Sequence, residues 1–201
     1  MKTLTMKQIR AITQASKNEV LVDIYEVDLN YAKTMLDDIT KKSKTLWDKQ
    51  NGEAQVSNTY DSNLTGHIAE LAVRDYFVEQ GYSNVEAPDL ESYRNNQHET
   101  SPYDIIIDKD IFVQVKGISD PLDPKYQVTE KNTLKYLGNN TALVVFVYVN
   151  KETYRANIYG IATPQDMLES NKVEENNNRD PMKRKCYSAR DVAIRPWMTL
   201  A

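Results

Sequence analysis

The sequence of 201 residues predicts an α/β fold in which a mixed central β-sheet has helices on both faces. Three observations predict it. Residues 63–80 carry apolar side chains at helical spacing. Residues 103–117 contain two short apolar strands separated by a tight turn, which is the pattern of a β-hairpin. Residues 142–149 form a continuous apolar run, typical of a strand buried on both faces of a sheet. Helices and strands therefore alternate along one core.

The helix expected over residues 63–80 is the clearest element. Ser62 or Asn63 is suited to cap its start, and Gly81 is suited to end it. The segment after it, about 82–87, is a poorly defined candidate for the first strand of the sheet. The apolar residues of the helix recur at Leu64, Ile68, Leu71 and Val78.

The hairpin is predicted to consist of strands 103–108 and 111–117, joined by a turn at Lys109 and Asp110. A short helix is expected at 127–137, before the buried strand. Four further features are expected after this short helix: the buried strand 142–149, an edge strand at 153–161, a helix at 164–170 that opens on Pro164, and a solvated loop at 171–182.

The first 60 residues are predicted to be a mostly helical N-terminal appendage that serves recognition or oligomerisation. The polar, turn-rich stretch 50–63 separates it from a main domain over 61–201, which ends in a basic tail. The appendage is expected to contain a helix at 5–16, a strand at 19–27 and a charged helix at 29–50.

Composition excludes several classes of protein. Hydrophobic residues make up 40% and charged residues 27%, which excludes a disordered or collagen-like chain. The net charge of −4 argues against a general polycationic nucleic-acid binder, so any such binding must use local patches. No apolar run is long enough to span a bilayer, and the first ten residues lack the apolar region of a signal peptide. We therefore expect a cytoplasmic protein.

Cys186 is the single cysteine, which excludes an internal disulfide and a cysteine-based zinc site. It stands beside basic residues, which lower a thiol pKa, but no partner for nucleophilic catalysis is visible in the sequence.

The hairpin carries the most informative polar residues. Asp104 opens the first strand, while Gln114 and Lys116 lie two residues apart on the second strand and so share one face of it. Val113 and Val115 point to the opposite face. The fold-back of the hairpin is expected to bring Asp104 near the same place, so that a carboxylate, an amide oxygen and an ammonium group converge.

This combination of groups fits phosphodiester hydrolysis. The carboxylate of Asp104 and the amide oxygen of Gln114 are hard oxygen ligands suited to Mg²⁺, and the backbone carbonyl of Val115 can supply another. A bound Mg²⁺ ion polarises a phosphate and lowers the pKa of its water. The ammonium of Lys116 can hold an attacking water or stabilise charge that develops on the phosphate.

The motif resembles that of a known family. Pro102-Tyr103-Asp104, then nine residues, then Gln114-Val115-Lys116 is similar to the PD-(D/E)XK nuclease superfamily, in the variant of some restriction and homing endonucleases that has Gln in place of Glu. The resemblance covers about half of the chain. It implies a restriction-endonuclease-like αβββαβ core over about 62–150. Many members also carry a glutamate on the helix before the first strand, and Glu70 falls there.

The resemblance implies a metal-dependent DNA endonuclease. Asp104, Gln114 and the Val115 carbonyl would hold Mg²⁺ or Mn²⁺, Glu70 would contact the metal or its water, and Lys116 would be the catalytic lysine. Cutting both strands usually needs two active sites, so a homodimer or larger assembly is expected. Basic residues that could contact DNA follow the hairpin and occupy the tail: Lys125, Lys131, Lys135, Lys183, Arg184 and Lys185.

Other interpretations remain open at this stage. Asp104 could cap a strand, and Gln114 and Lys116 could form the solvent face of an amphipathic strand. His67 is more simply a capping or surface residue than a metal ligand. The neutral Gln114 departs from the usual acidic residue, which makes a second metal ion less favourable. A catalytically inactive nuclease-fold protein that binds nucleic acid or a partner protein is therefore the alternative function.

Overall fold

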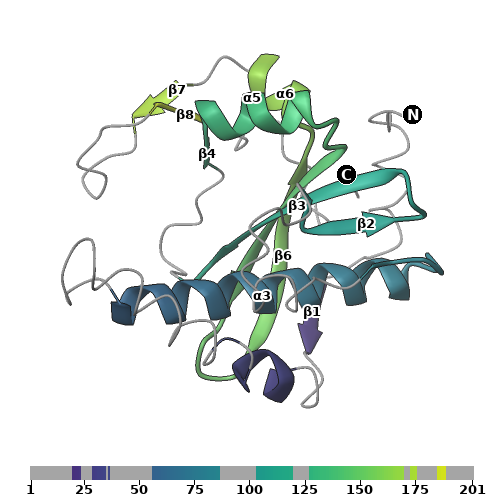
Figure 1. Ribbon diagram of the computed structural model, residues 1–201, viewed down its shortest axis with the longest axis vertical. Coiled ribbons are helices and arrows are strands. Elements are labelled where there is room, and N and C mark those ends of the chain that lie inside the picture. Colours follow the sequence, from purple (N-terminus) through teal and green to yellow (C-terminus); the bar gives the residue numbers. More distant parts are fainter. Residues whose placement is uncertain are drawn as a thin grey trace, which may run out of the picture.

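The computed structural model describes residues 20–23, 29–34, 36, 56–86, 103–119, 127–169, 173–175 and 185–188. Within these residues a five-stranded mixed sheet is packed on one face by the long helix α3 (Val56–Glu79). The other face packs against α5 (Glu130–Gly138) and α6 (Pro164–Glu169), as Figure 1 shows. The predicted α/β class with a mixed sheet between helices is confirmed.

The strands of the main sheet have the order β1-β6-β5-β3-β2. β3 and β5 are parallel, and the other neighbouring pairs are antiparallel. A parallel pair requires a crossover, which here passes through α5 on one face of the sheet. The strands are β1 (Val20–Asp23), β2 (Ile105–Ile107), β3 (Ile111–Ile118), β5 (Leu143–Val149) and β6 (Arg155–Ala162).

The hairpin of β2 and β3 forms as predicted, with Ile105 opposite Val113. Its turn occupies 108–110, and Asp108 and Lys109 both have positive φ, 50° and 67°, as a tight hairpin turn of this hand requires. The strand expected at 82–87 is reduced to a single antiparallel bridge between Val85 and Ile107.

β5 is buried on both faces, as its continuous apolar sequence predicts. Val145 and Val147 pack into the core beneath α3, whereas Val144 and Phe146 belong to the core beneath α5 and α6. The prediction that β6 is an edge strand is wrong, because β1 pairs with its outer side. Its alternating apolar residues from Ala156 to Ala162 are accordingly buried.

Helix α3 begins at Val56, not at the predicted 63, and ends before Gly81, which has a φ of 91°. No glycine or proline interrupts 56–65, so the polar residues of that stretch continue the helix instead of capping it. The end is as predicted, because the left-handed conformation after a helix favours glycine.

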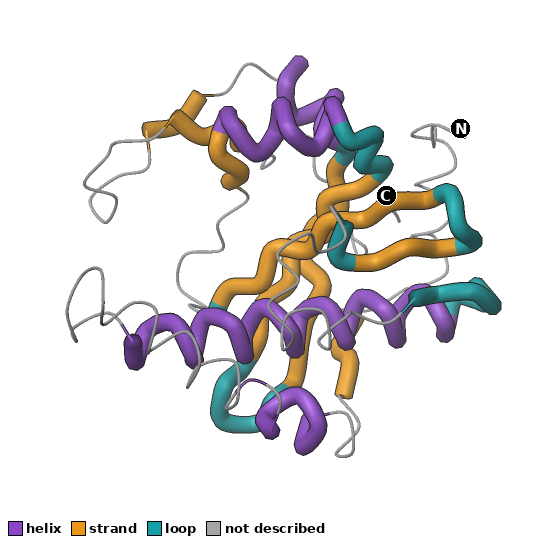
Figure 2. The backbone as a smooth tube through the Cα atoms, in the orientation of Figure 1, coloured by secondary structure: helices purple, strands orange, loops and turns teal. Residues whose placement is uncertain are grey.

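The face opposite α3 carries a second, three-stranded sheet of order β4-β8-β7. Part of the segment 171–182, which was predicted to be a loop, forms strand β7. In the segment 127–137, which was predicted to be a helix, the first three residues form strand β4, and helix α5 begins only at Glu130 (Figure 2). The thiol of Cys186 on β8 is buried and is not in a disulfide. The strands of this second sheet are β4 (Gln127–Thr129), β7 (Val173–Glu175) and β8 (Lys185–Ser188).

Part of the segment predicted as an appendage lies against the main core. β1 adds the outer strand beside β6, and residues 29–34 and 36 are helical, with Leu29 in the core beneath α3. The helix expected at 5–16 lies outside the described residues. No helix among the described residues has the length and apolar character needed to cross a bilayer.

Candidate active site

Asp104 is fixed at the point where β2 and β3 separate. Its backbone N–H donates to the Val113 carbonyl at 3.1 Å, and its Oδ2 accepts a hydrogen bond from the Val115 N–H at 2.7 Å. β2 begins only at Ile105, so the Asp104 carboxylate replaces a backbone carbonyl as the next acceptor along β3. The side chain is thereby held in the plane of the sheet, at its edge.

The same edge presents a backbone carbonyl. In a β-strand the N–H and C=O of one residue point toward the same neighbouring strand. Because the Val115 N–H faces Asp104, the Val115 carbonyl faces that side as well. Among the described residues no strand pairs with this side of β3 beyond Val113. The predicted carbonyl ligand therefore lies on the uncovered edge that carries Asp104.

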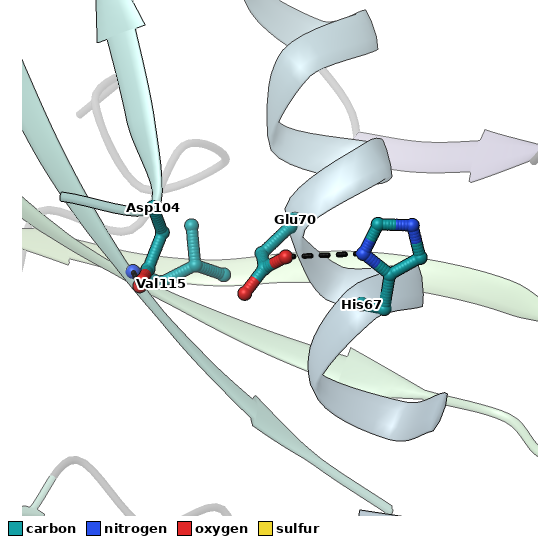
Figure 3. Close-up of polar contacts among 4 residues, drawn as sticks. All are labelled: His67, Glu70, Asp104 and Val115. Carbon is teal, nitrogen blue, oxygen red and sulfur yellow. Dashed lines mark hydrogen bonds and ion pairs between the residues drawn. The ribbon is translucent and has the colours of Figure 1, made fainter. Parts of the chain in front are cut away.

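Glu70 reaches this edge from helix α3. Its side chain is 25% exposed, and its Oε2 lies 3.1 Å from the Nδ1 of His67, one turn earlier (Figure 3). Glu70 is therefore partly buried. The expectation that His67 is a capping or surface residue is wrong, because its side chain is only 5% exposed. His67 lies within the helix and on its inner side, where Glu70 supplies a polar partner.

A close approach of α3 to β3 fixes where Glu70 lies. A methyl group at Gly117 would be 2.9 Å from both the Ala69 Cβ and the Thr65 carbonyl oxygen. Only a glycine on β3 permits this separation between the strand and the backbone of the helix. The contact is next to Lys116 on the strand and next to Glu70 on the helix, so it sets the spacing of those two elements at the site.

Gln114 and Lys116 lie on the other face of β3, as their spacing predicts. They stand opposite Val144 and Phe146 of β5, which belong to the core beneath α5. Gln114 is buried, with 6% exposure, which excludes a purely solvated face for it. The ammonium of Lys116 lies 5.4 Å from the centroid of the Tyr136 ring on α5.

Asp104, Glu70 and Lys116 lie close enough to one another at this edge for their charges to interact. Burial raises the pKa of Asp104 to about 6, and the charge of Glu70 adds to the rise. The charges of Lys116 and Lys135 and the hydrogen bond from Val115 act in the opposite direction. Two carboxylates from different elements thus share a poorly hydrated place without full compensation by cations.

The pKa of Lys116 is above its ordinary value. Burial alone would lower that pKa, but the interactions with Tyr136, Asp104 and Glu70 outweigh burial. Lys116 is therefore a charged ammonium at neutral pH, with a partner ring on one side and acidic groups on another.

The six basic residues suggested for nucleic-acid contact fall into three groups. Lys131 and Lys135 are exposed one turn apart on α5, and Lys135 is near enough to lower the pKa of Asp104. Lys185 belongs to β8. The remaining three lie outside the described residues: Lys125, Lys183 and Arg184.

Tyr136 is the site residue that sequence reasoning did not identify. It is buried and has no motif around it, so only the crossover of α5 places it over β3. The i, i+3 spacing of His67 and Glu70 makes them neighbours on a helix, but that spacing alone does not reveal that His67 is buried.

The donor set can be compared with what a metal ion needs. In the part of the chain that the structure describes, no group of three or more His, Cys, Asp and Glu side chains is placed to hold a metal. The predicted set needs only two of these, Asp104 and Glu70, with the oxygens of Gln114 and Val115 completing it. Comparisons with protein-family models, curated proteins and solved structures gave no match to the chain.

Proposed function

We propose that this protein is a metal-dependent phosphodiesterase, most specifically a DNA endonuclease. The observation that carries the proposal is that Asp104, Glu70 and Lys116, from three different chain segments, lie close enough for their charges to interact, beside an edge of β3 that no strand among the described residues covers. Two carboxylates and one ammonium in a poorly hydrated place match the needs of phosphoryl chemistry: a seat for a divalent cation and a positive group for the phosphate.

The order of elements adds support. Helix α3, the bridge at Val85, strands β2 and β3, helix α5 and strand β5 follow one another along the chain, with β3 parallel to β5. This order approaches the helix, three strands, helix and strand that the PD-(D/E)XK resemblance implies, with a single bridge in place of the first strand and β4 inserted before α5. We therefore extend the proposal to a restriction-endonuclease-like core.

The donor set fits a hard divalent cation. Asp104, the Val115 carbonyl and Gln114 would hold Mg²⁺ or Mn²⁺, with Glu70 on the ion or on its water. The pKa of Asp104 is raised, chiefly by burial and then by the charge of Glu70, and a cation bound at this carboxylate would offset both effects. When bound, the ion would polarise the phosphate and acidify a water molecule.

The chain's own residues then have distinct tasks. The Val115 N–H and the edge of β3 orient the Asp104 carboxylate. His67 holds one oxygen of Glu70, which leaves the other oxygen for the site. The Lys116 ammonium, charged at neutral pH, stabilises the negative charge that builds on the phosphate oxygens or holds the attacking water. Lys131 and Lys135 on α5 provide positive charge for the flanking phosphates.

The test is cleavage of supercoiled plasmid, linear duplex, branched DNA and single-stranded DNA in Mg²⁺ or Mn²⁺, with EDTA as the metal-free control. Lys116→Met removes the ammonium while retaining an unbranched side chain. Lys151→Met, at an exposed turn between β5 and β6, is the matched control. Metal-dependent cutting that Lys116→Met abolishes and Lys151→Met retains supports the proposal. Cutting that survives Lys116→Met refutes it.

A second function is favoured by one observation. Gln114 is neutral and buried where the family pattern has an acidic residue, so the site holds one carboxylate fewer. This favours a nuclease-fold module that binds nucleic acid or a partner without cutting. Such a protein would retain DNA binding in EDTA, bind no Mn²⁺ in calorimetry and cut none of the four substrates.

An endonuclease that cuts both strands of a duplex usually needs two active sites, one for each strand. We therefore propose that this protein is a homodimer. Light scattering coupled to size-exclusion chromatography tests this on the full chain, with and without duplex DNA in Ca²⁺. A monomer under both conditions would contradict it.

A further inference from the structure

Tyr136 is the closest aromatic partner of the Lys116 ammonium among the described residues. The Lys116 Nζ lies 5.4 Å from the centroid of its ring, within the about 6 Å at which a ring face attracts a cation. The interaction with Tyr136 also raises the pKa of Lys116 and so favours the charged ammonium. In contrast, among the described residues no ion pair within 4.0 Å joins Lys116 to Asp104 or to Glu70. The ammonium is thus near the two carboxylates without contacting them.

Tyr136 is itself held rigidly. Its side chain is 4% exposed and packs with Phe146 and Met167 in the core beneath α5 and α6. The start of α5 is capped by Thr129, whose Oγ1 accepts from a backbone N–H of the first turn at 3.3 Å. At the other end, the Tyr136 carbonyl accepts from the Thr141 N–H at 2.9 Å.

Helix α5 is also tied to the residue beside Asp104. The Tyr103 hydroxyl donates to the Asn139 carbonyl at 2.5 Å, and the Tyr103 ring stacks on Phe112 with centroids 3.9 Å apart. The element that carries Tyr136 is therefore fixed to the hairpin that carries Asp104 and Lys116. This linkage gives the Tyr136 ring a defined position relative to both charged groups.

We propose that Tyr136 is a positioning residue, which holds the Lys116 ammonium over its ring and out of a direct ion pair with Asp104. The inference rests on the proposed function, because its purpose is to keep Asp104 open to a metal ion and Lys116 directed to a phosphate. A lysine side chain has several rotatable bonds, and without a fixed partner its ammonium would move to the nearest carboxylate. That ion pair would compete directly with a bound cation.

The test compares metal binding in two backgrounds. Tyr136→Leu removes the ring, and Tyr159→Leu, in the same buried cluster, is the matched control. Mn²⁺ affinity is measured by isothermal titration calorimetry in the otherwise native protein and again in Lys116→Met. We expect Tyr136→Leu to weaken Mn²⁺ binding about threefold to tenfold in the native background and to have no effect in Lys116→Met, where no ammonium can compete.

A merely structural role for Tyr136 would lower Mn²⁺ affinity equally in both backgrounds, and that result would overturn the proposal. Unchanged affinity in the native background would overturn it as well. Cleavage kinetics add a second measurement, with kcat expected to fall about tenfold in Tyr136→Leu while KM for DNA stays constant.

A failure of the proposed function is distinguished by a measurement that needs no metal. If the native protein binds no Mn²⁺ and cuts no DNA, the proposed function fails. Urea unfolding of the native protein, the two single variants and the double variant then decides whether Tyr136 contacts Lys116. Coupling of about threefold or more in the unfolding equilibrium constant supports Tyr136 as the partner of Lys116. Additive costs of Tyr136→Leu and Lys116→Met refute it.

Discussion

Substitution of Asp104 by Asn should stabilise the metal-free protein. Asp104 has a pKa of about 6 in the folded chain, chiefly because of burial and then because of Glu70, against an ordinary 3.8. The folded state therefore binds the proton more tightly than the unfolded state does. Stability is unaffected below the unfolded pKa of 3.8 and falls as the pH rises through about 6.

The size of the effect follows from that difference. At about 1.4 kcal/mol for each unit of pKa, ionised Asp104 lowers the free energy of unfolding by up to about 3 kcal/mol above pH 7. Asn carries no charge, and its Oδ1 still accepts the hydrogen bond from the Val115 N–H. Asp104→Asn should thus be more stable than the native protein at pH 8 in EDTA, by up to about 3 kcal/mol, and nearly equal to it at pH 4.

Urea unfolding followed by circular dichroism at pH 4, 6 and 8 measures this directly. Asp108→Asn is the matched control, since Asp108 is exposed on the hairpin turn and Asn tolerates its positive φ. Saturating Mg²⁺ should reverse the order, because only the native carboxylate gains from the ion. The reasoning is refuted if Asp104→Asn shows no gain at pH 8, or a gain that does not change with pH.

Three further substitutions test the geometry around the site. Gly117→Ala should destabilise the fold by about 1–3 kcal/mol and lower cleavage, because the added methyl group forces β3 away from the α3 backbone; a thermal scan without a loss of stability would contradict the close approach. His67→Ala should weaken Mn²⁺ affinity severalfold, because Glu70 loses the partner that holds its carboxylate. Calorimetry measures the affinity, and an unchanged value would contradict this role of His67. Lys131→Ala combined with Lys135→Ala should reduce the slope of log K against log salt for duplex binding by about 2 in fluorescence anisotropy, and an unchanged slope would remove α5 from the interface.

The hairpin strands and β5 could be predicted from sequence because each has a local signal, whereas β4 and β7 lie in segments predicted as a helix and a loop. The continuous apolar run of β5 and the turn at 108–110 need no distant information. Helix α3 begins earlier than expected because the polar residues before position 63 neither favour nor oppose a helix strongly. Only the end of the helix, at Gly81, has a strong signal in the sequence. β6 was taken as an edge strand because its partner β1 lies more than a hundred residues earlier in the sequence.

The candidate site divides in the same way. Asp104, Gln114 and Lys116 could be named because a hairpin brings them together through local pairing. Tyr136 could not be named, since its place depends on how the crossover through α5 packs over β3. His67 was misjudged because burial of one helix face depends on the close approach at Gly117, and sequence periodicity does not reveal that distance.

The edge of β3 explains why groups from both faces of the sheet can act together. Glu70 comes from the α3 side and Lys116 from the α5 side, and a complete sheet would separate them by its own thickness. The ladder between β2 and β3 stops at Ile105, so Asp104 fills the gap and interacts with both. The shortness of β2 therefore creates the site, and one more ladder pair toward Tyr103 would bond the Val115 N–H to a backbone carbonyl and leave Asp104 without its anchor.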